Sequence, residues 1–197
     1  MIDIKNISKE EPYLVFVDEY NKALKRKQST IEAICISTID QTSSKVFSRM
    51  VNLKYIINNE WIFFTNYESP KACQIATNDN IAALFYWPTT KTQIRINATI
   101  SKTESKFSDA HFSKRSNEKN ALAISSKQSK KILSYQEVLK EYKSVFNKNN
   151  LSRPSYWGGF SFKPYYFEFW EGHESRINKR KIYELQGSAW KQHFLQP

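Results

Sequence analysis

The chain has 197 residues, of which 40% are hydrophobic and 15% aromatic, and its formal net charge is +11. This length fits one domain with a full hydrophobic core, and the apolar share excludes a disordered chain. The excess of lysine and arginine suits polyanions or small phosphorylated ligands as partners, and it says nothing about the fold.

No stretch approaches the roughly 18 apolar residues of a membrane-spanning helix, and the N-terminus lacks the pattern of a signal peptide. We therefore expect a soluble cytoplasmic protein that forms a single domain over residues 1–197. The two cysteines, Cys35 and Cys73, have neither CxxC spacing nor a nearby histidine, which predicts two buried thiols. The three histidines show no metal-ligand spacing, so we predict no metal site.

The first predicted element is an amphipathic helix over about residues 10–27. Pro12 occupies a first-turn position, Tyr13, Phe16 and Tyr20 recur at helical spacing, and the segment ends in three basic residues. A β-branched, apolar strand is then predicted over residues 31–39, followed by a polar turn.

Residues 47–71 are the most informative stretch. Two runs rich in β-branched and aromatic residues flank Asn58-Asn59, which predicts a β-hairpin that leads into a helix over about residues 69–77. Arg49 and Lys54 lie in the first strand and Lys71 in the first helical turn, where the helix dipole already favours an anion. These cations predict a site for a phosphorylated ligand, and the alternative is an ordinary basic hairpin with solvated side chains.

The second half of the chain adds strands and short helices. Strands are predicted over residues 81–87 and 92–101, and the last of these alternates between polar and apolar residues. Residues 101–131 have the Ser, Lys and Asn content of a linker, but they include a short helix capped by Ser108 and an apolar segment, residues 121–124, that can pack. A second amphipathic helix follows over residues 134–146, with Ser134 and Glu137 as a capping box.

Three or four antiparallel strands are predicted in residues 156–160, 165–172, 176–185 and 189–195. In total we expect seven or eight strands and three or four short helices, the pattern of an α+β domain built on an antiparallel barrel. Gly158-Gly159 is too short for a dinucleotide fingerprint and is better explained as relief of crowding at a strand bend.

Nucleic acid is a rival ligand for so basic a chain. Arg95, Tyr67, Trp157 and Trp170 could stack bases, but most aromatics fall on apolar strand faces, where core packing is the usual role.

Several motifs in order along nearly the whole chain resemble the pyridoxine (pyridoxamine) 5′-phosphate oxidase family. They are Ser-Arg-Met-Val-Asn-Leu-Lys at 48–54, Phe-Phe-Thr-Asn-Tyr-Glu-Ser-Pro-Lys at 63–71, Leu-Phe-Tyr-Trp at 84–87, Ser-Lys-Gln-Ser at 126–129, Arg-Pro-Ser-Tyr-Trp-Gly-Gly-Phe at 153–160, Glu-Phe-Trp-Glu-Gly at 168–172 and Arg-Ile-Asn-Lys-Arg at 176–180. The resemblance implies an FMN-binding split β-barrel with flanking short helices, and a homodimer with two flavins at the subunit interface.

The resemblance also implies the residues that bind FMN. They are Arg49, Met50, Val51, Asn52, Leu53, Lys54, Phe64, Thr65, Lys71, Gln93, Gln128, Ser129, Trp170 and Arg180. Charge-assisted bonds from Arg49 and Lys71 to a phosphate are chemically sensible. Strict strand alternation puts Arg49 and Lys54 on opposite faces, so a bulge is required if both serve one pocket.

The implied substrate positions are Lys54, His111, Arg115, Lys119, Arg176 and Asn178, with Arg176 and Asn178 nearest the reacting carbon. Three of them depart from the family pattern, because His111 replaces a tyrosine, Lys119 a serine and Asn178 a histidine. In addition, Pro70 replaces an arginine that in the family helps to hold FMN. Asn178 can form hydrogen bonds but cannot titrate.

The implied activity is oxidation of pyridoxamine or pyridoxine 5′-phosphate to pyridoxal 5′-phosphate, with O2 as electron acceptor. A first alternative is a related FMN oxidase of another anionic ring compound, such as a phenazine precursor. A second is a non-catalytic module that binds FMN or nucleic acid.

Overall fold

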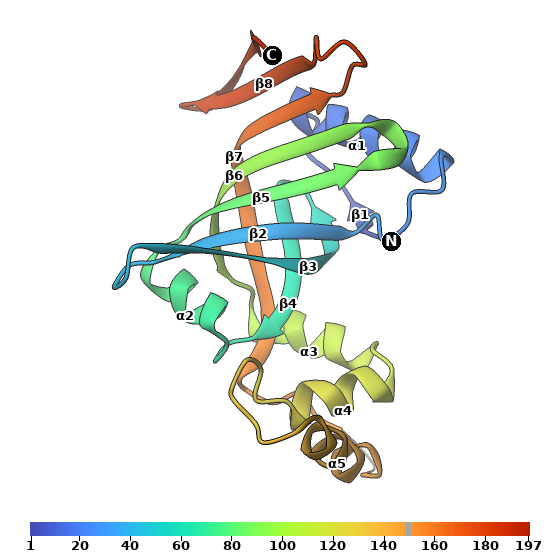
Figure 1. The fold of residues 1–197 in the computed structure, drawn as a ribbon, viewed down its shortest axis with the longest axis vertical. Helices are drawn as coiled ribbons and strands as arrows, with labels where there is room; N and C mark the ends of the chain where they lie inside the picture. The colour runs from blue at the N-terminus through green and yellow to red at the C-terminus, as the bar shows by residue number, and fades with distance from the viewer. Residues whose placement is uncertain (149–150) are drawn as a thin grey trace.

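The computed structural model describes residues 1–148 and 151–197, and it contains nine strands and five α-helices in these residues (Figure 1). The strands are β1 (Asp3–Lys5), β2 (Ala33–Asp40), β3 (Lys45–Ile57), β4 (Glu60–Asn66), β5 (Asn80–Trp87), β6 (Thr92–Lys102), β7 (Trp157–Glu171), β8 (Lys179–Gln186) and β9 (Ala189–Leu195). The helices are α1 (Glu11–Lys25), α2 (Pro70–Thr77), α3 (Ser105–Ser113), α4 (Asn117–Ser125) and α5 (Tyr135–Phe146).

Six of the strands close into a barrel. The sheet runs β3-β2-β5-β6-β7, and β4 pairs with both β3 and β7, which completes the ring. β8 and β9 extend the sheet beyond β7, and the short β1 pairs in parallel with β3. The predicted α+β class and split barrel are confirmed, and β1 is an element that the sequence pattern did not predict.

Helix α1 packs its apolar stripe against aromatic residues of the barrel core. Phe16 is completely buried, with its ring centroid 4.4 Å from that of Trp61, and Tyr13 packs edge-on against Phe167 at 5.4 Å. Burying a side chain such as Phe16 stabilises the fold by about 1.5 to 3 kcal/mol. The predicted helix is confirmed, with Pro12 in its first turn and basic residues in its last.

The predicted hairpin and its following helix are also confirmed. β3 and β4 pair in antiparallel register around Asn58-Asn59, and α2 begins at Pro70. Gly158 and Gly159 relieve crowding, as predicted. A Cβ atom at Gly158 would lie 2.2 Å from the Tyr67 hydroxyl, and one at Gly159 would lie 2.6 Å from the Thr103 hydroxyl.

The two strands predicted at 156–160 and 165–172 are in fact the single strand β7. Pro164, which has no N–H to donate, lies between the two predicted strands. The β6–β7 register shifts there, since Ala98 pairs with Pro164 and Asn97 with Tyr166. The ladder accommodates the proline at this irregularity, and the strand continues through it.

Residues 101–131 are not a linker, because they form α3 and α4. The predicted packing of the apolar segment is confirmed by Ala121, which is fully buried. The predicted cap is wrong, since Ser108 lies inside α3 and accepts a hydrogen bond from the Gly159 N–H at 3.0 Å. In α5 the predicted cap is present, with Ser134 Oγ accepting from the Glu137 N–H at 3.3 Å.

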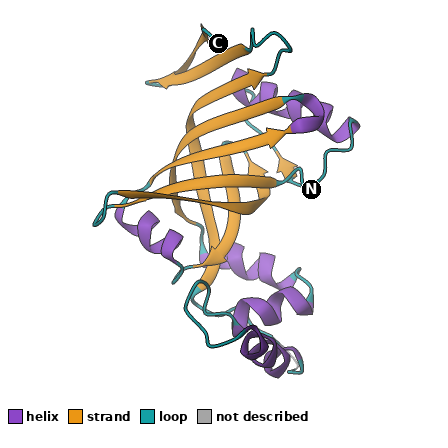
Figure 2. Ribbon diagram, in the orientation of Figure 1, coloured by secondary structure: helices purple, strands orange, loops and turns teal. Residues whose placement is uncertain are grey.

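Four of the helices gather at one end of the barrel, whereas α1 lies apart from them (Figure 2). None of the described helices is long and apolar enough to cross a membrane. The expectation of two buried thiols is wrong. Cys73 is exposed because it lies on the outer face of α2, opposite Ala72 and Ile75, and Cys35 is only partly buried in β2.

Candidate functional site

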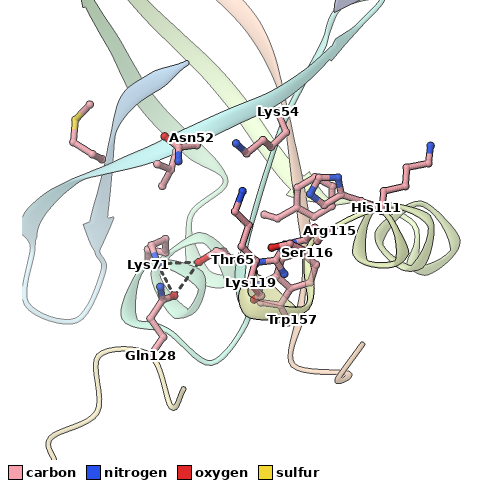
Figure 3. Close-up of a pocket in the computed structure, with 14 residues that line it drawn as sticks. Asn52, Lys54, Thr65, Lys71, His111, Arg115, Ser116, Lys119, Gln128 and Trp157 are labelled. Atoms are coloured by element: carbon pink, nitrogen blue, oxygen red, sulfur yellow. Dashed lines mark hydrogen bonds between the residues drawn. The ribbon is translucent and has the colours of Figure 1, made fainter. Parts of the chain in front are cut away.

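A cavity of about 500 Å³ lies where the β3–β4 hairpin meets α2, α3, α4 and the loop after α4. Figure 3 shows Asn52 and Lys54 on one side of this space, and Lys71, Gln128 and Lys119 on the opposite side. The full lining is Met50, Val51, Asn52, Lys54, Phe64, Thr65, Lys71, His111, Lys114, Arg115, Ser116, Lys119, Gln128 and Trp157. No aspartate or glutamate is among these residues, so the cavity is strongly cationic.

Lys71 is a buried cation that is held only by neutral groups. Only 8% of the residue is exposed, and its ammonium group donates to the Thr65 hydroxyl at 3.0 Å, to the Ser69 hydroxyl at 3.2 Å and to Gln128 Oε1 at 3.0 Å. Burial lowers the pKa of Lys71 to about 8, and the positive charge of Arg49 contributes to that shift. A phosphate in this position would supply the missing negative charge.

Arg49 is near enough to Lys71 for its charge to act on that residue, but it does not line the cavity. Its guanidinium donates to the Ile36 carbonyl at 3.2 Å, to the Thr38 hydroxyl at 2.6 Å and to Gln74 Oε1 at 3.1 Å. Burial lowers the pKa of Arg49. Neither Arg49 nor Lys71 has a carboxylate within 4.0 Å among residues 1–148 and 151–197.

Strand β3 contains an irregularity of the kind that strict alternation requires if Arg49 and Lys54 are to serve one site. The β3–β4 register shifts between Leu53 and Tyr55, so Lys54 is the extra residue. Leu53 stays completely buried in the core, whereas Lys54 lines the cavity. Burial lowers the pKa of Lys54, and the charges of Lys119 and Arg115 act in the same direction, against that of Glu32.

A second group of cations comes from the end of α3 and the start of α4. Arg115 lies over the Trp157 ring, with 4.3 Å between the guanidinium carbon and the ring centroid, and Nη2 donates to the Lys119 carbonyl at 2.9 Å. Its Nη1 atom is buried and has no hydrogen-bond partner among the described residues. An unpaired, buried donor beside a cavity is a group that an anionic ligand can satisfy.

The aromatic side of the cavity is built from parallel rings. His111 stacks on Phe64 with 3.7 Å between centroids, and Phe64 stacks on Trp157 at 5.4 Å. The Tyr55 hydroxyl lies 2.8 Å from His111 Nδ1. Burial lowers the pKa of His111 to about 4, aided by Arg115, Lys54 and Lys114, so His111 is neutral at pH 7.

The structure therefore brings some, but not all, of the residues implied by the resemblance together in one cavity. The cavity is lined by eleven of them: Met50, Val51, Asn52, Lys54, Phe64, Thr65, Lys71, Gln128, His111, Arg115 and Lys119. Arg49 lies outside this lining, and its charge acts on Lys71. The lining also includes Lys114, Ser116 and Trp157, which the sequence reasoning did not assign. Lys114 and Ser116 flank Arg115 in the chain, so proximity to that residue was the available signal.

The other predicted residues lie elsewhere. Gln93 pairs with Trp170 across β6 and β7, and Trp170 pairs with Arg180 across β7 and β8, so these three side chains form one row. Trp157, which lines the cavity, and Trp170 lie at opposite ends of β7, roughly 40 Å apart along the strand at about 3.3 Å per residue.

Arg176 and Asn178 lie in the loop between β7 and β8, beside this second row. Arg176 is exposed and has a positive φ of 59°, and Asn178 Oδ1 accepts a hydrogen bond from the His173 N–H at 3.0 Å. Ser129 neighbours Gln128 but lines a separate cavity of about 310 Å³ with residues of α5. One chain thus holds two separate groups of the predicted residues.

Two of the residues considered for base stacking are already engaged within the chain. Trp157 is only 6% exposed, and Arg95 forms an ion pair with Glu168 at 2.8 Å. These contacts favour a structural role for both residues.

Comparisons with known proteins match most of the chain. A family profile described as pyridoxamine 5′-phosphate oxidase matches residues 18–149, and one described as the pyridoxine 5′-phosphate oxidase C-terminal dimerisation region matches residues 157–197. A pyridoxine/pyridoxamine 5′-phosphate oxidase of Colwellia psychrerythraea is 37% identical over 84% of this chain and 77% of the relative. Another, of Leptospira biflexa, is 33% identical over 95% of this chain and 89% of the relative.

Two solved structures share the fold. PhzG from Burkholderia lata, crystallised with tetrahydrophenazine-1-carboxylic acid, gives a TM-score of 0.90 at 24% identity and covers 95% of this chain and 93% of its own. A pyridoxamine 5′-phosphate oxidase-related, FMN-binding protein from Nostoc punctiforme gives a TM-score of 0.77 at 14% identity and covers 96% of this chain and 99% of its own. At these identities the structures establish the split-barrel fold alone.

Proposed function

Because this chain belongs to the pyridoxine/pyridoxamine 5′-phosphate oxidase family, a family of FMN-dependent oxidoreductases, we propose that it binds FMN and oxidises pyridoxamine or pyridoxine 5′-phosphate with O2. The observation that carries the proposal is the buried Lys71 with the partly buried Arg49 near it, which have neutral hydrogen-bond partners and no carboxylate within 4.0 Å in the described part of the chain. Buried cations of this kind are stabilised by an anionic ligand.

The residues of the cavity fit FMN by their charge and their hydrogen-bonding groups. Lys71, with the positive charge of Arg49 near it, is our assignment for the flavin phosphate, and Thr65 and Gln128 supply polar groups beside it. Phe64 offers a flat apolar surface next to them. When bound, FMN would supply the redox chemistry, which is the transfer of a hydride's two electrons from the substrate to O2 with hydrogen peroxide as the second product.

The protein's own contribution is binding, orientation and electrostatics. We assign the substrate phosphate to Lys54, Arg115 and Lys119, whose charges converge on the cavity. His111 is neutral there, so it contributes a hydrogen bond and not a charge.

We further propose that each site is completed by a second copy of the chain. In this arrangement one copy supplies the cavity, and its partner supplies the row Gln93, Trp170 and Arg180 together with Arg176 and Asn178. The separation of the two groups along β7 supports this, as does the match of residues 157–197 to a dimerisation region.

The number of aromatic residues in 165–170 predicts that some of them lie at a subunit interface. Phe167 and Phe169, however, are buried within the chain itself, whereas Tyr165 is 37% exposed. Exposed apolar side chains also occur on β3, where Met50 is 62% exposed, and on β9, where Phe194 is 62% exposed.

Mixed dimers test the shared site. A chain carrying Arg49→Ala and Lys71→Ala is co-expressed with a chain carrying Arg180→Ala, and the heterodimer is isolated with two affinity tags. We expect little FMN in either parent dimer and about one FMN in the mixed dimer, because one of its two sites is intact. A mixed dimer as empty as the parents would contradict the shared site.

The FMN assignment itself is tested by the Arg49→Ala, Lys71→Ala double variant. Each lost charge-assisted bond costs about 1.5 to 3 kcal/mol, or about 10- to 150-fold in affinity. Lys45→Ala is the matched control, because Lys45 is an exposed cation on the same strand as Arg49. Full flavin occupancy in the double variant would refute the assignment.

A second candidate, an FMN oxidase of another anionic ring compound, rests on the three altered substrate positions, His111, Lys119 and Asn178. The added charge at Lys119 and the loss of a titratable group at Asn178 both change the substrate end of the site. Peroxide release from pyridoxamine 5′-phosphate and from tetrahydrophenazine-1-carboxylic acid, compared at equal concentration, distinguishes the two candidates. Turnover of the second compound alone would favour this alternative.

A further inference from the structure

Glu168 is a buried carboxylate that bridges two arginines. It lies in β7 and is only 1% exposed, with Arg95 Nη1 2.8 Å from Oε2 and Arg180 Nε 2.7 Å from Oε1. The Tyr166 hydroxyl also donates to Oε2, at 3.3 Å. A buried carboxylate is tolerated only when it is fully paired, and here both oxygens have cationic partners.

The strand register explains how Glu168 reaches Arg180. Glu168 pairs directly with Arg95 on β6 and with Ile182 on β8, whereas Arg180 pairs with Trp170. Arg180 is therefore the diagonal neighbour of Glu168 on the same face of the sheet, a separation of about 7 to 8 Å between backbones that two long side chains can span. The contact is set by the sheet and not by loop conformation.

Arg180 is also held from the C-terminal side. Its Nη1 atom donates to the Gln196 carbonyl at 3.0 Å. Nε and Nη1 are thus both occupied, and Nη2 has no hydrogen-bond partner among residues 1–148 and 151–197. The strand register places Arg180 beside Trp170, which in turn lies beside Gln93, so the free NH2 group belongs to this row.

We propose that Glu168 is a positioning residue, which clamps Arg180 so that its free Nη2 group is presented to the flavin in the row with Gln93 and Trp170. This inference rests on the proposed FMN function. Glu168 does not touch the ligand itself and acts only through Arg180. Arg95 neutralises the second oxygen of Glu168, so the carboxylate keeps a full set of partners.

A double-mutant cycle on FMN affinity tests the clamp. The dissociation constant is measured by flavin fluorescence on apoprotein of the wild type, Glu168→Gln, Arg180→Ala and the double variant. We expect each single variant to bind FMN at least about tenfold more weakly, the loss typical of a charge-assisted bond. We expect the double variant to bind no more weakly than Arg180→Ala, because Glu168 has no effect once Arg180 is gone.

The matched control is Glu184→Gln, since Glu184 is a half-buried glutamate on β8 that pairs with Tyr166. It should leave FMN affinity within about twofold of the wild type. If the losses in Glu168→Gln and Arg180→Ala multiply in the double variant while the wild type binds FMN normally, this inference alone is overturned. A wild type that binds no FMN overturns the proposed function and this inference with it.

The variant Arg180→Lys tests the same inference if Glu168→Gln does not fold. Lysine retains the positive charge. It lacks the planar guanidinium, whose Nε and Nη1 bind Glu168 and Gln196 while Nη2 stays free for a ligand. We expect its FMN affinity to fall as far as that of Arg180→Ala. Wild-type affinity in Arg180→Lys would show that charge alone is sufficient and would overturn the clamp.

Discussion

Replacing Lys71 with methionine should stabilise the folded apoprotein but weaken its binding of FMN. Methionine keeps an unbranched chain of similar length and removes the ammonium group. Burial lowers the pKa of Lys71 from 10.5 to about 8, and each pKa unit corresponds to about 1.4 kcal/mol, so the charge costs the apoprotein about 3 kcal/mol at pH 7.

The sign of the pH dependence follows from proton binding. Between pH 8 and 10.5 the unfolded chain keeps a proton on Lys71 that the folded apoprotein has lost, so stability rises with pH across that window. Below pH 8 both states are protonated and the full penalty remains. The free energy of unfolding of the wild type minus that of Lys71→Met should therefore increase by about 3 kcal/mol from pH 8 to 10.5.

Bound FMN makes the charge of Lys71 favourable, because the FMN phosphate pairs with the charged form of this side chain. At pH 7 we expect Lys71→Met to bind FMN about 10- to 150-fold more weakly than the wild type. Wild-type affinity should itself fall as pH rises above about 8, since Lys71 must then take up a proton to pair with the phosphate.

Urea unfolding of both apoproteins from pH 7 to 10 and fluorescence titration with FMN provide the two measurements. Parallel stability profiles for the two proteins would refute the burial argument. Equal FMN affinities would refute the placement of the phosphate at Lys71.

Three further predictions concern the substrate end of the site and the assembly. Asn178→His should raise kcat for pyridoxamine 5′-phosphate, because a general acid or base typically contributes about 10² to 10⁴ fold, and a wild-type kcat of about 1 s⁻¹ or more would show that Asn178 is harmless. Arg115→Met and Lys119→Met should each raise KM for the phosphorylated substrate about tenfold or more while FMN content stays unchanged, and an unchanged KM would remove them from the phosphate site. Sedimentation should show an obligate homodimer, and a stable flavin-loaded monomer at micromolar concentration would contradict the shared site.

The hairpin and its helix could be predicted because their signals are local. Alternating β-branched residues, the Asn58-Asn59 turn and Pro70 each act within a few residues, and the structure has the elements there. The α4 helix could not be predicted in the same way. Its composition is that of a loop, and it is held by contacts outside the helix, such as the hydrogen bond from Asn120 Nδ2 to the Phe112 carbonyl of α3 at 3.0 Å.

The chemistry of the site was only partly accessible from the sequence. The pattern of cations identified Lys54 and Lys71, and strand alternation indicated the irregularity that the structure has at Lys54. The neutral state of His111 depends on its stacking with Phe64 and on surrounding charges, which a sequence does not place. The distance between the cavity and Trp170 depends on β7 being one long strand, whereas the sequence pattern predicted two shorter ones.

The central claim is that the protein is a flavin oxidase of a phosphorylated pyridine, and the visible spectrum tests it most directly. The purified protein should carry noncovalent FMN. Its flavin absorbance should be lost when pyridoxamine 5′-phosphate is added without oxygen, and it should return with peroxide when air is admitted. A protein that is purified without flavin and does not take up added FMN, or a bound flavin that the substrate leaves oxidised, would contradict the claim.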